Sequence, residues 1–217
     1  MKRFVSEVER FAPESYYWET FSDELKTTLS SAAFRKEPEV ILIDPVPLTM
    51  SAMNKLVGHA SRAVILLTNA NHERGALAMR ENMRISIWAH KDAKPDMEIE
   101  ANDYFEDGDE LPAGLTAIHL PGSSPSETAF YTPANGGMVF VGDALVNLNP
   151  DNGMAFLPDK YSHDPKQSRQ SLRKLLKLEF EMMTFAHGQP VTKDAKKRLA
   201  ALLDGSHSRK FKAVEGE

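Results

Sequence analysis

A run of polar side chains at residues 66–75, Leu-Leu-Thr-Asn-Ala-Asn-His-Glu-Arg-Gly, carries the groups best suited to chemistry. Amide, imidazole, carboxylate and guanidinium groups stand close together there, and they can ligate a metal, accept a proton or bind an anion. The run follows the apolar segment 63–67, which is typical of a strand buried on both faces, and a helical segment begins near Gly75. Because α/β proteins place ligand sites at such strand-to-helix turns, we expect the functional site here.

Three later segments carry further groups of this kind. They are residues 119–125 (His-Leu-Pro-Gly-Ser-Ser-Pro) with Ser123, residues 140–145 (Phe-Val-Gly-Asp-Ala-Leu) with Asp143, and residues 186–190 (Ala-His-Gly-Gln-Pro) with His187. A carboxylate and an imidazole are ligands for divalent metals. No histidine has a sequence signature that places it beside the serines as a base, so a serine nucleophile is not expected.

Together the four segments resemble the signature of the metallo-β-lactamase superfamily, in the family's order and spacing from about residue 25 to 203. The turn at 68–74 resembles Thr-His-x-His-x-Asp-His, and the later segments resemble Pro-Gly-His-Thr-Pro, Phe-x-Gly-Asp-x-Leu and His-Gly-x-Pro. The resemblance implies an α/β fold, the αββα four-layer sandwich, with its site along one edge between two sheets. It also implies metal-assisted hydrolysis of esters, thioesters, lactones, lactams or phosphodiesters.

The positions that the resemblance assigns to the first metal ion are changed in this chain. The family holds that ion with three histidines, whose places are taken by Asn69, Asn71 and Ser123. Amide and hydroxyl oxygens are weak ligands for zinc compared with imidazole. We therefore expect the first metal position to be lost.

The positions of the second ion are taken by Glu73, Arg74, Asp143 and His187. Three of these can ligate, but a guanidinium cannot, because it stays protonated. At ~4 Å from a dication and an effective dielectric of ~20, Arg74 would meet roughly 8 kcal/mol of repulsion. We therefore favour the hypothesis that Arg74 itself supplies the positive charge, paired with Asp143 or Glu73.

Two hypotheses for function follow. In the first, the dinuclear site is degenerate, no cofactor is expected, and the protein is a pseudoenzyme or binds a small, anionic ligand. Its candidate ligand-binding residues are Asn69, Asn71, Arg74, Ser123 and His72. In the alternative, the protein is a mononuclear hydrolase of an ester, thioester or lactone. One divalent ion, zinc, manganese or iron, then lies on Asp143, His187 and Glu73, which are the candidate catalytic residues and metal ligands.

His72 lies at the variable position of the family's motif. Because adjacent residues of a helix do not share a face, we expect its side chain to hydrogen-bond the loop rather than to ligate. A shifted site that uses His72 stays open.

The hydrophobic pattern predicts the elements that position these residues. Strands are expected at 25–34, 40–43, 63–67, 85–88, 115–119, 128–131, 138–141 and 182–185, and helices at 50–60, 76–83, 165–177 and 195–203. Thr49 is the expected N-cap of the helix at 50–60. We expect one domain over 1–217, with an aromatic covering segment at 1–24 and a polar tail at 205–217.

Composition excludes several classes of protein. The chain of 217 residues contains no cysteine, which excludes disulfides and thiolate zinc sites. A formal net charge of −5 without a basic block argues against nucleic-acid binding. No apolar run approaches the ~20 residues that a membrane span needs, so no membrane association is expected. These features favour a cytoplasmic protein.

Overall fold

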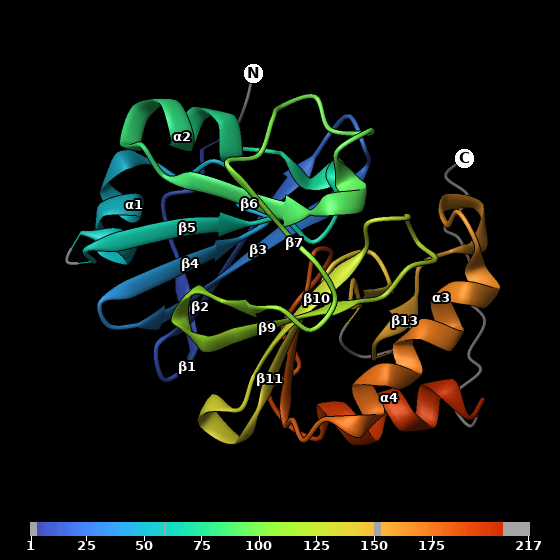
Figure 1. Ribbon diagram of the computed structural model, residues 1–217. Coiled ribbons are helices and arrows are strands. Elements are labelled where there is room, and N and C mark those ends of the chain that lie inside the picture. The colour runs from blue at the N-terminus through green and yellow to red at the C-terminus, as the bar shows by residue number, and fades with distance from the viewer. Residues whose placement is uncertain (1–3, 59, 150–152, 206–217) are drawn as a thin grey trace.

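The computed structural model describes residues 4–58, 60–149 and 153–205 (Figure 1). Within these residues, the first sheet has seven strands in sequence order: β1 (Glu9–Ala12), β2 (Ser15–Ser22), β3 (Thr27–Lys36), β4 (Glu39–Ile43), β5 (Arg62–Leu66), β6 (Ser86–His90) and β7 (Asp103–Phe105). The second has five, in the order β14 (Met182–Phe185), β11 (Met138–Val141), β10 (Thr128–Thr132), β9 (Leu115–His119) and β8 (Glu110–Leu111). Strands β12 (Leu145–Val146) and β13 (Ala155–Phe156) pair separately.

Helices connect the parallel strands of the first sheet. Strands β4, β5 and β6 are parallel, with α1 (Met50–Val57) and α2 (Ala76–Met83) between them. The predicted N-cap is confirmed, since the side chain of Thr49 accepts a hydrogen bond from the backbone N–H of Ala52 at 3.3 Å. This strand-helix-strand order places the turn after β5 at the carboxyl edge of the sheet.

The layers follow from the alternation of side chains along the strands. In β4, Val40 and Leu42 pack into the core beneath α1 and α2, whereas Ile41 and Ile43 pack between the two sheets. Helices α3 (Pro165–Ser171) and α4 (Ala195–Leu203) cover the outer face of the second sheet (Figure 1). The predicted αββα four-layer sandwich is confirmed.

Two segments differ from the sequence-based expectation. Residues 9–12 and 15–22 form strands β1 and β2 at the edge of the first sheet rather than a cover over it. The helix predicted at 165–177 is α only as far as Ser171 and continues as a 3₁₀-helix over Leu172–Lys177. Most of the predicted polar tail lies outside the described residues. Among those described, no helix has the length and apolar character needed to cross a membrane.

Candidate metal centre

The site residues follow strands from both sheets. Asp44 directly follows β4, and Thr68 lies just after β5, its parallel neighbour. In the second sheet, Asp143 and His187 follow the parallel pair β11 and β14. Because carboxyl ends of parallel strands meet at one sheet edge, the topology gathers these side chains from distant parts of the sequence.

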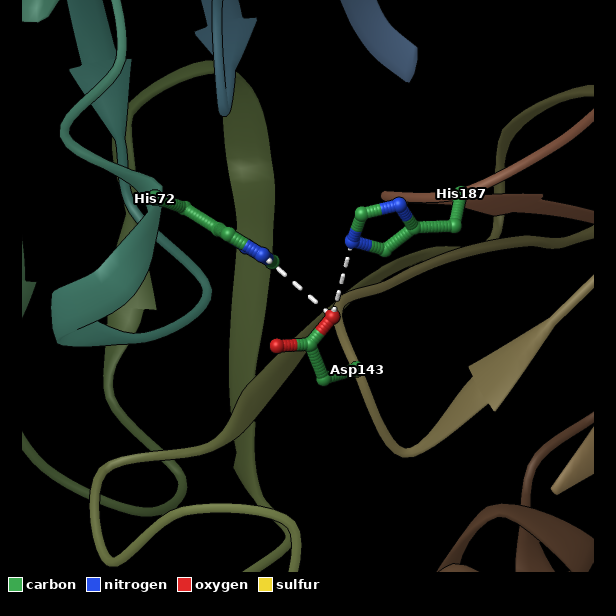
Figure 2. Close-up of side chains that lie close together, drawn as sticks. All are labelled: His72, Asp143 and His187. Atoms are coloured by element: carbon green, nitrogen blue, oxygen red, sulfur yellow. Dashed lines mark ion pairs between the residues drawn. The ribbon is translucent and has the colours of Figure 1, made fainter. Parts of the chain in front are cut away.

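His72, Asp143 and His187 form a compact cluster at this edge (Figure 2). Oδ1 of Asp143 lies 3.3 Å from Nε2 of His72 and 3.2 Å from Nε2 of His187. This oxygen is buried and makes no hydrogen bond with the described residues. Burial acts to raise the pKa of Asp143, but the neighbouring imidazoles hold it well below its usual range. The carboxylate is therefore ionised and faces both rings.

The contacts of Nδ1 in the two imidazoles fix the orientation of each ring. Nδ1 of His72 lies 2.9 Å from Oδ2 of Asp44. Nδ1 of His187 lies 2.8 Å from the carbonyl oxygen of Thr28. Since both neighbours are acceptors, we assign the ring proton to Nδ1 in each case, which leaves the Nε2 lone pairs directed at the cluster. Metal-ligating histidines are held in this way.

The cluster fits a metal ion by its own dimensions. Two atoms bound to one tetrahedral zinc at ~2.0–2.1 Å from the metal lie about 3.3 Å apart. The two contacts to Oδ1 of Asp143 have this length. Three converging lone pairs also repel one another unless a cation, a metal or a proton, lies among them. In the protein without metal, the Asp143 and Asp44 carboxylates outweigh burial and raise the pKa of His72 to about 9.

Asp44 holds His72 in place through a fully hydrogen-bonded carboxylate. Its Oδ1 accepts from the backbone N–H of Thr68 at 2.8 Å, and its Oδ2 accepts from the Thr68 hydroxyl at 2.6 Å. Burial acts to raise the pKa of Asp44, but the charge on His72 and these hydrogen bonds lower it overall. The carboxylate therefore orients the imidazole and increases its basicity.

Replacing Asp44 with Asn should weaken metal binding by about 10–100-fold, the usual cost of losing an outer partner of a metal-ligating histidine. Competition with a fluorescent chelator measures the dissociation constant. Asp194→Asn, at an exposed position, is the control. Equal affinity in the Asp44 variant and the wild type would contradict the orienting role.

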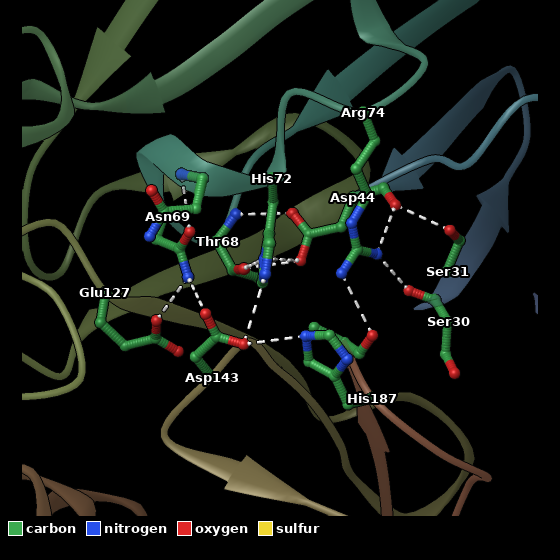
Figure 3. A network of polar contacts seen from close by, with 12 residues as sticks. Ser30, Ser31, Asp44, Thr68, Asn69, His72, Arg74, Glu127, Asp143 and His187 are labelled. Atoms are coloured by element: carbon green, nitrogen blue, oxygen red, sulfur yellow. Dashed lines mark hydrogen bonds and ion pairs between the residues drawn. The ribbon is translucent and has the colours of Figure 1, made fainter. Parts of the chain in front are cut away.

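Glu127 is a site residue that sequence analysis misses. Its Oε2 accepts a hydrogen bond at 2.8 Å from Nδ2 of Asn69, which also lies 3.3 Å from Oδ2 of Asp143 (Figure 3). Its Oε1 accepts from the backbone N–H of Ala144 at 3.2 Å. Gly142 makes this packing possible, because a Cβ there would lie 2.6 Å from Oε1 of Glu127. The only signal in the sequence was a single charged residue at the start of an apolar strand.

Glu127 should make the metal-free protein less stable as the pH rises. Burial first, and then the charge on Asp143, raise the pKa of Glu127 from 4.5 to about 8. The folded chain keeps a proton that the unfolded chain releases, so this contribution to stability is lost between about pH 4.5 and about pH 8. Urea unfolding of chelator-treated protein across this range checks the slope. Glu127→Gln should flatten it, and Glu24→Gln, at an exposed position, should not. Parallel slopes for the wild type and Glu127→Gln would count against the assignment.

The chain brings His72, not Glu73, to Asp143 and His187. Oε1 of Glu73 instead accepts a hydrogen bond from the backbone N–H of Ile99 at 2.8 Å. The reason is the shape of the turn. Residues Ala70–His72 form a 3₁₀ turn, and Arg74 has a positive φ of 38°, so a regular helix starts only at Ala76. The expectation for His72 assumed a helix at this point.

Arg74 does not pair with Asp143 or Glu73. Its guanidinium donates to three backbone carbonyls, those of Ser30 at 2.6 Å, Asp44 at 3.1 Å and Ala186 at 3.2 Å (Figure 3). These carbonyls belong to β3, to the residue directly after β4 and to the loop after β14. Arg74 therefore ties the two sheets together instead of replacing the ion.

Hydrogen bonds also run directly from β3 to the loop at residues 186–188, which carries His187. We call this contact between the two sheets the seam. The backbone N–H of Ser30 donates to the Ala186 carbonyl at 2.8 Å, and the backbone N–H of Gly188 donates to Oγ of Ser30 at 3.0 Å. Together with the Thr28 carbonyl, these contacts fix the position of His187 from the opposite sheet.

The remaining predicted residues lie beside the cluster. Asn69 caps the 3₁₀ turn, since its Oδ1 accepts from the backbone N–H of Asn71 at 2.9 Å. Asn71 is exposed and Ser123 is buried, and both line one pocket. They provide polar contacts near the cluster but stand outside it.

A second histidine pair is less suited to metal. The rings of His90 and His119 stack at 4.0 Å with an angle of 18° between their planes. Nearly parallel rings direct their in-plane lone pairs side by side rather than at one point. Nδ1 of His90 already accepts from the backbone N–H of Asp92 at 3.2 Å. The group of His90, Asp92 and His119 is therefore less suited to holding an ion than the cluster of His72, Asp143 and His187.

This chain combines an α/β sandwich with a cluster of histidine and carboxylate side chains at one edge, and the two together are typical of metal-dependent hydrolases. The family model described as the metallo-β-lactamase superfamily matches residues 8–205, and the chain belongs to this superfamily. A search of curated proteins gives no match.

Solved structures share the fold at low sequence identity. The DIM-1 metallo-β-lactamase is 14% identical with a TM-score of 0.72, covering 93% of this chain and 98% of its own. A metallo-β-lactamase from Erythrobacter litoralis is 15% identical with a TM-score of 0.69, covering 91% and 92%. TTHA1623 in a di-iron-bound form is 24% identical with a TM-score of 0.65, covering 84% and 98%.

The expectation that no cofactor is bound is wrong. The structural neighbours, which include metallo-β-lactamases and the di-iron-bound TTHA1623, and the cluster of His72, Asp143 and His187 point to metal use. The expectation failed because it placed the Arg74 guanidinium where an ion would lie. That group is held by backbone carbonyls, and His72 supplies the imidazole that the motif position lacked.

Proposed function

We propose that this protein is a mononuclear metal-dependent hydrolase of an ester, thioester or lactone. The observation that carries the proposal is the convergence of the Nε2 atoms of two imidazoles on an ionised carboxylate oxygen that has no hydrogen-bond partner among the described residues. His72, Asp143 and His187 would hold one zinc, manganese or iron ion. Three protein ligands are the number that catalytic zinc sites use when one position stays open for water or substrate.

The ion, when bound, lowers the pKa of water and polarises the bond to be broken. The residues of the chain supply the rest. Asp44 and the Thr28 carbonyl orient the two imidazoles, and the Asn69 amide donates to Oδ2 of Asp143, which leaves Oδ1 for the ion. Glu127 holds that amide in place and is itself fully buried, so it acts as a positioning residue. Asn71, which is exposed at the same turn, would contact the substrate.

The arrangement at the family's first metal position favours one bound ion rather than two. The Asn69 amide group lies between the carboxylates of Glu127 and Asp143 and donates to both. Because Glu127 is protonated and the Asn69 amide is neutral, the hydrogen bonds between these groups form without a cation at the first metal position. The proposal therefore expects one ion per chain.

Elemental analysis of protein purified without chelator tests this directly. About one equivalent of zinc, manganese or iron, with hydrolysis of members of an ester, thioester and lactone panel that stops on chelation and returns on adding metal, supports the proposal. Substoichiometric metal together with no hydrolysis after reconstitution would favour the pseudoenzyme instead.

A further inference from the structure

A pocket of about 460 Å³ lies beside the metal cluster and shares with it the turn that carries His72. One part of its lining is the serine turn with Ser123, Ser124 and Ser126, and another part includes Lys160 and His163. Asn71, from the turn that carries His72, also lines it. The volume lies in the range of small-molecule sites, roughly 300–1,000 Å³.

Hydrogen bonds to backbone carbonyls hold the two parts of the lining together. The backbone N–H of His163 donates to the Ser123 carbonyl at 3.1 Å, and the Ser162 hydroxyl donates to the Gly122 carbonyl at 3.1 Å. The pocket is thus bounded by segments fixed to each other.

Two hydroxyl groups of the serine turn have unused hydrogen-bonding capacity. Oγ of Ser123 and Oγ of Ser124 are buried and have no partner in the described part of the chain. Buried hydroxyls without partners are uncommon and often mark the place of an absent water, ion or ligand. Because a serine changes rotamer at little cost, these groups can turn toward a molecule in the pocket.

The charge in the pocket comes from Lys160. It is exposed, has no ion-pair partner among the described residues, and its Nζ lies 4.7 Å from the ring centroid of Tyr161. Arg74, the other cation considered for ligand binding, is held by its three carbonyls. Asp96 is the carboxylate in the described lining, and it too is exposed.

We propose that this pocket binds an anionic group of the substrate, a carboxylate or a phosphate. The ammonium of Lys160 neutralises the group, and the hydroxyls of Ser123 and Ser124 donate hydrogen bonds to it. The inference rests on the proposed function, since it assigns the part of the substrate that is not hydrolysed. Asn71 and Ser123 take the positions of family metal ligands, so a lysine ammonium provides a positive charge beside a place where relatives keep an ion.

A titration of the ¹⁵N-labelled, metal-loaded full chain with inorganic phosphate tests the proposal. Saturable shifts should concentrate at the backbone amides of residues 122–126 and 159–163. Lys160→Met should weaken binding by about five-fold, the upper end for an exposed ion pair, whereas Lys160→Arg should retain it. Asp96→Asn should tighten binding, because it removes a negative charge from the lining. Lys166→Met, which removes an exposed lysine of α3 outside the pocket, is the matched control.

Shifts confined to the surroundings of His72, Asp143 and His187 would place the phosphate on the ion and overturn the proposal. Equal weakening by Lys160→Met and Lys166→Met would overturn it as well, since only the net charge would then matter. Metal content and hydrolysis are measured separately. The pocket can therefore fail while the hydrolase function holds, and the reverse.

Discussion

Asp143→Asn should lower metal affinity by more than about 100-fold and reduce hydrolysis to the background rate. Loss of an outer partner of a metal ligand costs about 10–100-fold, so loss of the anionic ligand itself should cost more. The substitution keeps the shape of the side chain but removes the charge that faces both imidazoles. Isothermal titration with zinc, alongside assays under metal saturation, measures both effects.

The control is Asp23→Asn, which removes an exposed carboxylate that is not part of the cluster. It should bind metal and hydrolyse substrate as the wild type does. If Asp143→Asn kept a full equivalent of tightly bound metal, the ligand set would have to be sought elsewhere.

Arg74→Ala should lower the free energy of unfolding by about 3–5 kcal/mol, because it removes the donor of three backbone carbonyls at once. Each hydrogen bond from the charged guanidinium contributes about 1.5–3 kcal/mol. The carbonyls of Ala186 and Asp44 keep a second donor, the Ser30 amide and the Ser31 hydroxyl, and this offsets part of the sum. Arg74→Lys should fall between the variant and the wild type, since an ammonium on a single stem cannot reach all three acceptors. Urea unfolding at constant metal saturation gives the comparison.

Arg198→Ala is the matched control, because Arg198 is exposed on α4. Its free energy of unfolding should stay within about 0.5 kcal/mol of the wild type. A similarly small change for Arg74→Ala would mean that the three carbonyls find other donors readily.

The fold could be predicted from the sequence because the hydrophobic patterns and the family motifs indicated the same order of strands and helices. The bounds of β9, β11, β14 and α4 match the predicted segments, since apolar runs there are flanked by turn residues. Strands β1 and β2 were not expected, because the aromatic residues 16–18 give no clear alternation of polar and apolar side chains. Which face aromatic residues cover depends on the sheet that forms beside them.

The sequence predicted the members of the cluster only where a motif directly follows a buried strand, which fixes the backbone position. Asp143 and His187 follow buried strands directly, so their positions could be inferred. In the turn after β5, the 3₁₀ geometry and the positive φ of Arg74 decide which side chains point inward. Those angles depend on bonds from Arg74 to residues 30, 44 and 186, which are distant in sequence.

The seam between β3 and the loop at residues 186–188 has a dynamic consequence. In the interior the two sheets pack through apolar side chains such as Ile41, Phe130 and Phe140, which can slide slightly without breaking a directional contact. At this edge the Ser30 and Gly188 amides are fixed by hydrogen bonds that cross from one sheet to the other. Their deuterium uptake should be as slow as that of the central strands, because opening either one requires the sandwich to separate. The imidazole of His187 is therefore preorganised for metal binding in the metal-free protein.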